Sequence, residues 1–505
     1  MQIEINSIIE NDFILSMDSF KWLEMDKIIN QLKNKYPNLM NDFNSFDGYT
    51  FPSSNYVTQF KDLKDKTRLI QIGNVNEDEW VITDAQKFEF VPNSYIKTKK
   101  KYLLESKCIL LSLTGGSDTY NDISSFFDAS FKGFLNQRVS AFSSNNNDDT
   151  LFYYFYALTK SKFFKDQWSG KGGIQKNTVS KERNRTYLPK INNKKVIAFI
   201  SIVAQAILNK EKLIKERHQA ILKNIEQELK ENQKSKKFKF EFPDNNEMEE
   251  IGRFDTGLYN EAFKSLNFLV KNYKYGSKDL ISRGFDWSRG TSLEQNFIKT
   301  RIDSDTYHKG FYELVLPTNI SQYGFVDKST FIGTPTKLKT ISQGDIIFGG
   351  EGFGKGRTYV VVENSNNVAT NYHGIRIINK NNNLTESIFI RCFLAFWRSK
   401  GMIDYIGVGG SGGHCAPSYF HLIETPLFPD EKQKEIAKLY HNASISYDIN
   451  KCTLDNFLQT DTNYNKQAGI YELDKTAKKL KAKLNEAIDD IINDRQVNIK
   501  FDIKK

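Results

Sequence analysis

The sequence predicts a protein of mixed α/β (α+β) class, with two related globular units in tandem and a long helical segment after each unit. Three observations predict this fold class. Motifs recur at an offset of nearly half of the 505 residues, buried-strand patterns occur in both halves, and two segments carry apolar residues at coiled-coil spacing. Length alone would indicate about three domains of ~150 residues. The repeat instead indicates two globular units and two helical arms.

Composition excludes several classes of protein. Apolar residues make up 39% and aromatic residues 13% of the chain, which is too much apolar surface for a disordered protein. No apolar run approaches the ~18 residues of a membrane span, and the first residues lack the pattern of a secretion signal. The four cysteines are widely separated, so we expect a reduced, cytoplasmic protein. The net charge of +10 favours a polyanionic partner.

The repeat begins with two segments of the same pattern, Leu104–Gly115 and Ile341–Gly352. Each is a polar turn followed by an apolar run and a glycine, which predicts a buried strand that ends in a tight turn. Four more pairs follow in the same order at offsets of 235 to 238 residues: Asn136–Ala141 with Asn371–Arg376, Leu151–Lys165 with Ser387–Ile403, Ser169–Gln175 with Gly407–His414, and Leu188-Pro189 with Thr425-Pro426. Five ordered pairs at a nearly constant offset indicate a tandem repeat. Further strands are expected at Arg68–Ile72 and Asp345–Phe348.

The first long helix is expected at Asn193–Lys236, because this segment contains neither glycine nor proline. About 40 residues would make a rod of roughly 60 Å. Its apolar seam repeats every seven residues, as in a coiled coil, at Ile200, Ile207, Ile214 and Ile221. Glu211 and His218 interrupt the companion positions of this seam, so we expect a partly polar interface.

The second helical region follows Pro429. A short helix at Glu431–Asn442 leads through an irregular stretch, Ser444–Asn465, to a second seam. The seam consists of Ile470, Leu473, Ala477, Leu480, Leu484, Ala487 and Ile491. An amphipathic helix needs a partner for its apolar stripe, so the two long helices are expected to pair with each other. The alternative is that each packs on its own globular unit.

The segment Gly349–Gly356 resembles a phosphate-binding loop, but its last position is glycine where that motif requires serine or threonine. A strand pattern, Arg357–Val362, follows it, whereas a phosphate loop opens a helix. We therefore predict a β-turn, and a nucleotide-binding enzyme that uses this loop remains the alternative.

His414, Cys415 and His421 do not provide the four ligands of a structural zinc site, so no metal is expected. No catalytic motif is found, which favours a binding protein over an enzyme.

The glycine loop at Ser169–Tyr187 combines basic and amide side chains. The basic residues are Lys171, Lys176, Lys181, Arg183 and Arg185, and the amides are Gln175 and Asn177. Basic groups neutralise phosphates, amides can pair with base edges, and glycines allow a close approach of the backbone. The second loop, Gly407–Pro417, carries less charge and would need help from Lys355, Arg357 or Arg376. The alternative is that these loops are merely solvated.

This order of α/β unit, glycine loop, short strand, proline and long helix, repeated twice, resembles the specificity subunit of type I restriction-modification enzymes. The resemblance covers about residues 60–235 and 280–500, and it is most specific at the loops 172–177 and 412–414. It implies target recognition domains at residues 1–192 and 237–429. It also implies a conserved helix at 193–236 and a conserved helical region at 430–505, which form an antiparallel coiled coil. The first 60 residues match no part of the family pattern.

The resemblance further implies a non-catalytic, sequence-specific DNA-binding protein that acts in DNA methylation and phage defence. Each recognition domain would read one half of a bipartite target, and the helices would set the spacer. Its partners would be double-stranded DNA, two modification subunits that use S-adenosylmethionine, and restriction or translocase subunits that use ATP and Mg²⁺, with no cofactor in this chain. Alternatives are the specificity partner of a type IIB-like fused enzyme and a protein scaffold that does not bind DNA.

By position in the motif, the resemblance assigns Gly173, Gln175, Lys176, Asn177, Gly413 and His414 to the loops that approach DNA. The basic residues Lys171, Arg183, Lys355 and Arg357 complete the predicted DNA-binding set. The predicted helix-packing set is Ile200, Ile207, Ile214, Ile221, Leu473, Leu480, Leu484 and Ile491.

Overall fold

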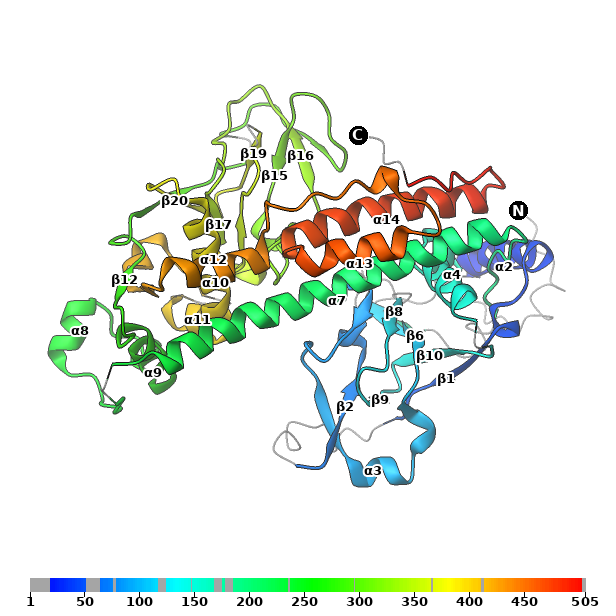
Figure 1. Ribbon diagram of the computed structural model, residues 1–505, viewed down its shortest axis with the longest axis horizontal. Helices are drawn as coiled ribbons and strands as arrows, with labels where there is room; N and C mark the ends of the chain where they lie inside the picture. The colour runs from blue at the N-terminus through cyan, green and yellow to red at the C-terminus, as the bar shows by residue number, and fades with distance from the viewer. Residues whose placement is uncertain are drawn as a thin grey trace. The chain divides into compact units, whose positions relative to one another are not determined.

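The computed structural model (Figure 1) describes residues 19–50, 64–75, 79–116, 124–146, 148–167, 175–177, 185–234, 237–294, 296–364, 367–409 and 413–501. The chain divides into two compact units. Unit 1 comprises Met1–Leu213, Ser446–Lys466 and Lys475–Lys505, and unit 2 comprises Ile214–Ile445 and Gln467–Asp474. Both units contain helices and sheets, so the predicted class of tandem α+β units with a long helix is confirmed. The domain boundaries predicted at residues 192, 236 and 429 stay predictions.

The main sheet of unit 1 has five strands in the order β1-β10-β6-β8-β3. Their bounds are Phe43–Asp47 for β1, Val139–Ser144 for β10, Cys108–Ser112 for β6, Ser124–Phe127 for β8 and Val81–Ile82 for β3. All neighbours are antiparallel except β3 and β8. All five residues of the central strand β6 are buried, as expected for the apolar run in Leu104–Gly115.

A second sheet of unit 1 has the order β4-β2-β9-β5, with bounds Glu89–Pro92, Lys66–Ile70, Gly133–Leu135 and Leu103–Leu104. The short strands β7 (Thr114–Gly116) and β11 (Gln175–Asn177) form a separate pair. The helices are α2 (Ser19–Lys35), α3 (Asn93–Lys97), α4 (Asp149–Thr159) and α5 (Lys162–Asp166). The Asp148 side chain caps α4 by accepting from the Thr150 and Leu151 N–H groups.

Unit 2 has a four-stranded sheet in the order β13-β20-β17-β18, with bounds Phe285–Arg289, Gly374–Asn379, Ile346–Gly349 and Thr358–Val360. Its second sheet has the order β14-β16-β15-β19, with bounds Ile302–Ser304, Thr330–Gly333, Tyr312–Leu314 and Val368–Ala369. The strands β12 (Ser277–Asp279) and β21 (Glu424–Pro426) pair with each other. The helices are α8 (Asn245–Ile251), α9 (Glu261–Lys271), α10 (Leu384–Ser399), α11 (Met402–Ile406) and α12 (Asp430–Tyr440).

The two units share their strand order, which confirms the predicted repeat. The series β1-β10-β6-β8 in unit 1 corresponds to β13-β20-β17-β18 in unit 2, and all of these neighbours are antiparallel. Isolated parallel bridges join Tyr49 to Asn136 in unit 1 and Thr291 to Asn371 in unit 2. Because β1 corresponds to β13, the repeat also includes residues before position 60, which sequence reasoning could not place.

Each predicted helical segment of the repeat is two helices. In unit 1 the break lies between α4 and α5, where the Ser161 hydroxyl accepts the Phe164 N–H and starts a new helix. In unit 2 the break lies between α10 and α11 at Gly401, whose φ of 75° is a left-handed conformation that ends a helix. The sequence predicted the helical residues but not these two interruptions.

The long helix α7 runs continuously from Lys194 to Glu231, a length of 38 residues (Figure 1). Its start agrees with the prediction, because the Asn193 side chain accepts from the Lys195 and Val196 N–H groups and caps the helix. Its end lies five residues before the predicted Lys236. Within the described residues, no helix combines the length and the apolar character that crossing a membrane requires.

The C-terminal region contains α13 (Phe457–Gln467) and α14 (Ile470–Ile492). The seam predicted at Ile470–Ile491 therefore lies on one helix. The stretch predicted to be irregular, Ser444–Asn465, contains most of α13, which corrects that expectation. The helix forms because Phe457 is fully buried and stacks on Phe501 in unit 1, a distant contact that the polar local sequence did not indicate.

Within unit 1, α7 and α14 run antiparallel. Phe199 near the start of α7 contacts Phe501 beyond the end of α14, whereas Glu211 further along α7 pairs with Lys481 earlier in α14. Six of the predicted seam residues share one core cluster with apolar residues of the main sheet: Ile200, Ile207, Leu480, Leu484, Ala487 and Ile491. The helices thus pair with each other and also pack on the globular part of unit 1. In unit 2, Ile214, Ile221 and Leu473 are buried as well.

Candidate nucleic-acid interface

The described middle of the unit 1 glycine loop pairs with the short strand that follows a central strand. Its middle residues, Gln175–Asn177, form β11, and there Lys176 lies opposite Gly115 of β7 in an antiparallel register. Gly115 is the glycine that ends the apolar run of the first repeat. Lys171, Gly173 and Arg183 lie outside the described residues, so their assignment to DNA binding stays a prediction.

The corresponding loop of unit 2 makes the same kind of contact. His414 forms antiparallel bridges with Glu351 and with Val408, and the His414 N–H donates to the Val408 carbonyl at 2.7 Å. Gly413 has a φ of 63°, the left-handed region in which glycine is favoured. Glu351 directly precedes Gly352, the repeat equivalent of Gly115. The repeat in sequence therefore corresponds to a repeated loop-to-strand contact.

The segment Gly349–Gly356 is a tight turn between the antiparallel strands β17 and β18, as predicted. A Cβ added to Gly349 would lie 1.9 Å from the Gly354 carbonyl oxygen, so the turn requires glycine at that position. The Lys355 ammonium pairs with the Asp404 carboxylate at 2.8 Å, and the lysine side chain is only 13% exposed. The turn does not open a helix, so this geometry does not favour the nucleotide-binding alternative.

The basic residues that the sequence suggested near this turn have internal partners. The Arg357 guanidinium donates to the carbonyls of Thr318 and Ile320 at 3.2 and 2.8 Å. The Arg376 guanidinium pairs with the buried Asp345 carboxylate at 2.6 Å. The assignment of Lys355 and Arg357 to DNA binding stays a prediction, and contact with a phosphate would compete with these existing bonds.

A different set of side chains gathers around His414, which we call the unit 2 loop cluster: Arg289, Glu351, Tyr372, His373 and His414. The Arg289 guanidinium lies 4.5 Å from the centre of the Tyr372 ring and 3.2 Å from the His414 Nε2 atom. The Glu351 carboxylate pairs with the His373 Nδ1 atom, and its second oxygen lies 3.5 Å from the His414 Nδ1 atom. Arginine, histidine and carboxylate groups at loop ends can form hydrogen bonds with base edges.

Sequence reasoning selected only His414 from the unit 2 loop cluster. Arg289 reaches it because β13 pairs with β20, where Arg289 lies opposite Ile375. Tyr372 and His373 belong to the pair Asn136–Ala141 and Asn371–Arg376 that established the repeat, and His373 is the equivalent of Arg138. The repeat alignment was therefore the available signal for these two residues.

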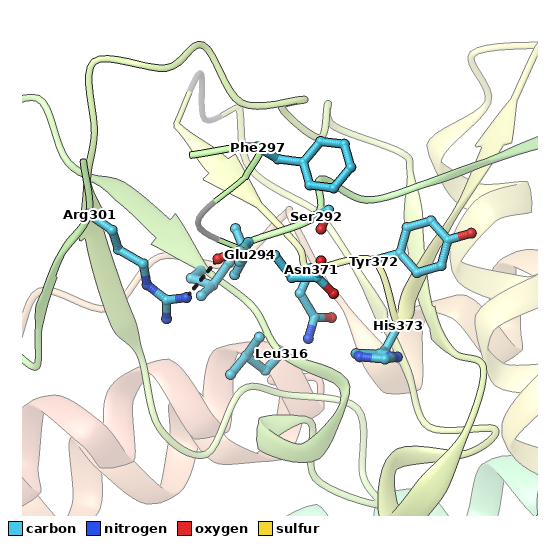
Figure 2. A pocket seen from close by; sticks show the side chains of 10 residues that line it. Ser292, Glu294, Phe297, Arg301, Leu316, Asn371, Tyr372 and His373 are labelled. Carbon is cyan, nitrogen blue, oxygen red and sulfur yellow. Dashed lines mark hydrogen bonds between the residues drawn. The ribbon is translucent and has the colours of Figure 1, made fainter. Parts of the chain in front are cut away.

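A cavity of about 600 Å³ in unit 2 adjoins this cluster and shares Tyr372 and His373 with it (Figure 2). Its walls come from the segment after β13, from the end of β15 and Leu316 just beyond it, and from the turn before β20. The lining residues are Ser292, Leu293, Glu294, Phe297, Arg301, Leu314, Leu316, Asn371, Tyr372 and His373. The size is typical of small-ligand sites, which measure roughly 300–1,000 Å³.

Residues 61–223 match the model of the family described as type I restriction modification DNA specificity domain. This segment resembles a type I DNA specificity domain. It contains β2, β6, the glycine loop and most of α7, so the family resemblance and the DNA-specificity function inferred from the sequence are confirmed. The alternative of a nucleotide-binding enzyme is not favoured.

Three solved structures are similar over most of the chain. The S subunit of a type I restriction-modification system from M. genitalium has 13% identity and a TM-score of 0.40, covering 89% of this chain and 95% of that one. The HsdS subunit from Thermoanaerobacter tengcongensis has 12% identity and a TM-score of 0.26, with coverage of 89% and 95%. A chain from work on complex assembly and conformational transition of the type I R-M system has 11% identity and a TM-score of 0.26, with coverage of 92% and 99%. Comparison with curated proteins found no match.

The globular part of unit 1 is joined to α7 through Glu211. The Glu211 carboxylate accepts the Trp80 backbone N–H at 2.6 Å and pairs with the Lys481 ammonium at 2.6 Å. The Trp80 carbonyl accepts the Tyr156 hydroxyl at 2.6 Å, and Lys160 and Lys481 both lie over the Trp80 ring. Glu211 therefore binds the globular part of unit 1 and α14 at one point of the seam.

His218, the second polar interruption of the α7 seam, is buried in unit 2. Its ring meets the Tyr323 ring edge-on, with 5.3 Å between centroids. Burial, together with the charges of Arg391 and Arg398, lowers the pKa of His218 to about 3. Both interruptions that the sequence marked on α7 are thus contacts with an aromatic residue of the globular part of the same unit.

The low pKa of His218 predicts a pH dependence of stability in unit 2. The folded state holds His218 neutral, while the unfolded chain binds a proton below the usual histidine pKa of ~6.5. Stability should therefore fall as the pH drops from ~6.5 toward 3, with a slope of up to about 1.4 kcal/mol per pH unit from this group. Urea titrations at several pH values should show that His218→Gln loses less stability over this window than the parent. Equal losses in both proteins would contradict the assignment.

Proposed function

We propose that this chain is the DNA-specificity subunit of a type I restriction-modification system and that each unit reads one half of a bipartite target. One observation carries the proposal. Unit 1 contains residues 61–213 of the segment that matches the specificity domain, and unit 2 repeats the strand order β1-β10-β6-β8 of unit 1 as β13-β20-β17-β18. Two copies of one DNA-reading domain in one chain suit an asymmetric target with two separate halves.

In this proposal the chain itself is not a catalyst. Methylation and cleavage belong to partner proteins: two modification subunits that use S-adenosylmethionine, and restriction subunits that use ATP and Mg²⁺. The helices α7 and α14 set the spacer and dock the modification subunits. The complex acts in the cytoplasm, where its DNA target lies.

The function is tested by mapping modified bases in the genome of cells with and without this chain. The proposal predicts one modified motif with two specified halves and an unspecified spacer, and this modification disappears when the chain is deleted. Modification that is unchanged by the deletion would contradict a role in specificity. A motif without a spacer would contradict the division of the target between the two units.

The residues of β11 give a sharper prediction for the first half-site. Gln175→Ala and Asn177→Ala should each reduce discrimination at one base pair by about 1–3 kcal/mol, because an amide can pair with a base edge. Lys176→Ala should instead weaken binding to all sequences and reduce the slope of log affinity against log salt by about 1. Competition binding with single-base variants of the target, repeated at several salt concentrations, measures both effects. Uniform loss in the amide variants would contradict their role in base readout.

A further inference from the structure

The cavity of unit 2 in Figure 2 combines an apolar floor with two aromatic side chains at the surface. Leu293, Leu314 and Leu316 line it, and Leu314 is buried. The Phe297 side chain is 63% exposed and that of Tyr372 is 49% exposed. In Figure 2, the Ser292 side chain lies below that of Phe297, and the Asn371 side chain lies further below, to the left of Tyr372. Exposed rings beside an apolar cavity are suited to stacking with a planar ligand.

The polar groups of the cavity disfavour a phosphate. Arg301 is already bound, because its guanidinium contacts both carboxylate oxygens of Asp303 at 3.0 Å and donates to the Leu293 carbonyl at 3.2 Å. His373 pairs with Glu351. The Glu294 carboxylate has no ion pair with any residue that the structure describes. A negative group without a counter-ion repels phosphate and favours a ligand that donates hydrogen bonds.

The Asn371 side chain is held in a fixed orientation and offers one further contact to a ligand in the cavity. Its side-chain oxygen accepts the Gly374 N–H at 3.2 Å, which holds the amide in place. The amide NH₂ group then remains for a ligand, since it has no acceptor among the described residues. A carboxylate that accepts and an amide that donates, beside aromatic faces, match the edge of a base that carries an amino group next to a ring nitrogen.

We propose that this cavity binds a single adenine or cytosine base. The base stacks on Phe297, its amino group donates to the Glu294 carboxylate, and a ring nitrogen accepts from the Asn371 amide. The target duplex supplies the base by extrusion from the half-site that unit 2 reads, and this source rests on the proposed function. Stacking is worth about 1–3 kcal/mol per base, which is of the same order as the cost of unpairing one base.

The first experiment uses free nucleosides with the full chain, observed by saturation-transfer NMR. Adenosine and cytidine should bind at least severalfold more tightly than thymidine. Phe297→Ala and Glu294→Gln should each weaken adenosine binding severalfold. The matched controls are Phe254→Ala, at a phenylalanine that is 79% exposed and does not line the cavity, and Glu249→Gln on α8, and both should bind as the parent does. Thymidine binding equal to adenosine, or an unchanged Phe297→Ala, would overturn the proposal.

The second experiment tests the duplex as the source of the base. In the duplex identified by genome mapping, an abasic site is placed opposite each adenine or cytosine of the second half-site in turn. Removing the pairing partner lowers the cost of extrusion, so binding should tighten severalfold at one position in the parent and not in Phe297→Ala. If no position tightens, extrusion is overturned. If the chain binds no duplex at all, the proposed function fails, while the nucleoside experiment still decides whether the cavity holds a base.

Discussion

Replacing Asp461 with leucine is expected to destabilise unit 1 by about 3–5 kcal/mol, because it leaves the buried ammonium of Lys210 without its counter-ion. The two side chains are 2% and 0% exposed and lie 2.6 Å apart, joining α13 to α7. Asn465 accepts from the same ammonium at 2.6 Å, and the rings of Tyr447 and Tyr464 lie 5.4 and 5.1 Å from it. The unfolding transition of unit 1 in calorimetry or urea measures the loss.

The double variant Lys210→Met with Asp461→Leu separates the buried charge from the packing. It removes both charges, so it should be less destabilised than either single variant, with a residual cost of about 1–3 kcal/mol for the polar groups left behind. Lys212→Met is the matched control on the same helix, because its pair with Asp128 is partly exposed. That control should lose less than about 1 kcal/mol. Additive losses in the double variant would show that the two charges do not stabilise each other.

Replacing Glu211 with leucine is expected to destabilise unit 1 by about 2–4 kcal/mol and to weaken reading of the first half-site. The change leaves the Trp80 N–H without its acceptor in a buried position and the Lys481 ammonium without its partner. Because this carboxylate joins the globular part of unit 1 to α7 and α14, the loss should appear both in the unfolding of unit 1 and in DNA binding.

Two further substitutions serve as controls for Glu211→Leu. Glu211→Gln keeps an acceptor for the Trp80 N–H and should recover part of the stability. Glu216→Gln, at an exposed position of α7, should change stability by less than about 0.5 kcal/mol. If Glu211→Leu were as stable as Glu216→Gln, the contacts of Glu211 with Trp80 and Lys481 would not stabilise unit 1.

The sequence allowed prediction of the repeat and the helix seams but not of the contacts between distant segments. Gly115 and Gly352 marked equivalent strand ends, and the seven-residue spacing of Ile200, Ile207 and their successors predicted burial correctly. Glu211 and His218 marked the polar points of the seam. Their aromatic partners could not be predicted, because the Trp80–Glu211 hydrogen bond joins residues 131 positions apart.

Local sequence also misplaced one helix for a physical reason. The stretch before Asn465 is polar and has no apolar periodicity, so it was expected to be irregular. It becomes helical because Asp461 satisfies the buried Lys210 and because Phe457 stacks on Phe501. Neither partner is near in sequence, so the stabilising contacts exist only once the chain has folded.

In the candidate site, too, the sequence identified residue types but not the contacts that those residues make in the fold. Lys355 and Arg357 were expected to supply basic charge to the second loop, but the fold gives them Asp404 and two backbone carbonyls as partners. Arg289 was overlooked because only the pairing of β13 with β20 carries it to His414. A sequence shows which side chains are basic, whereas the fold decides which of them are already neutralised.

The central claim, that each unit reads one half of the target, is tested most directly by exchanging residues 1–192 for the corresponding segment of another type I specificity subunit with a known target. Modified bases are then mapped in the genome of cells that express the hybrid. One half of the motif should change to that of the donor, while the other half stays as in the parent. A motif in which both halves change, or in which neither changes, would contradict the claim.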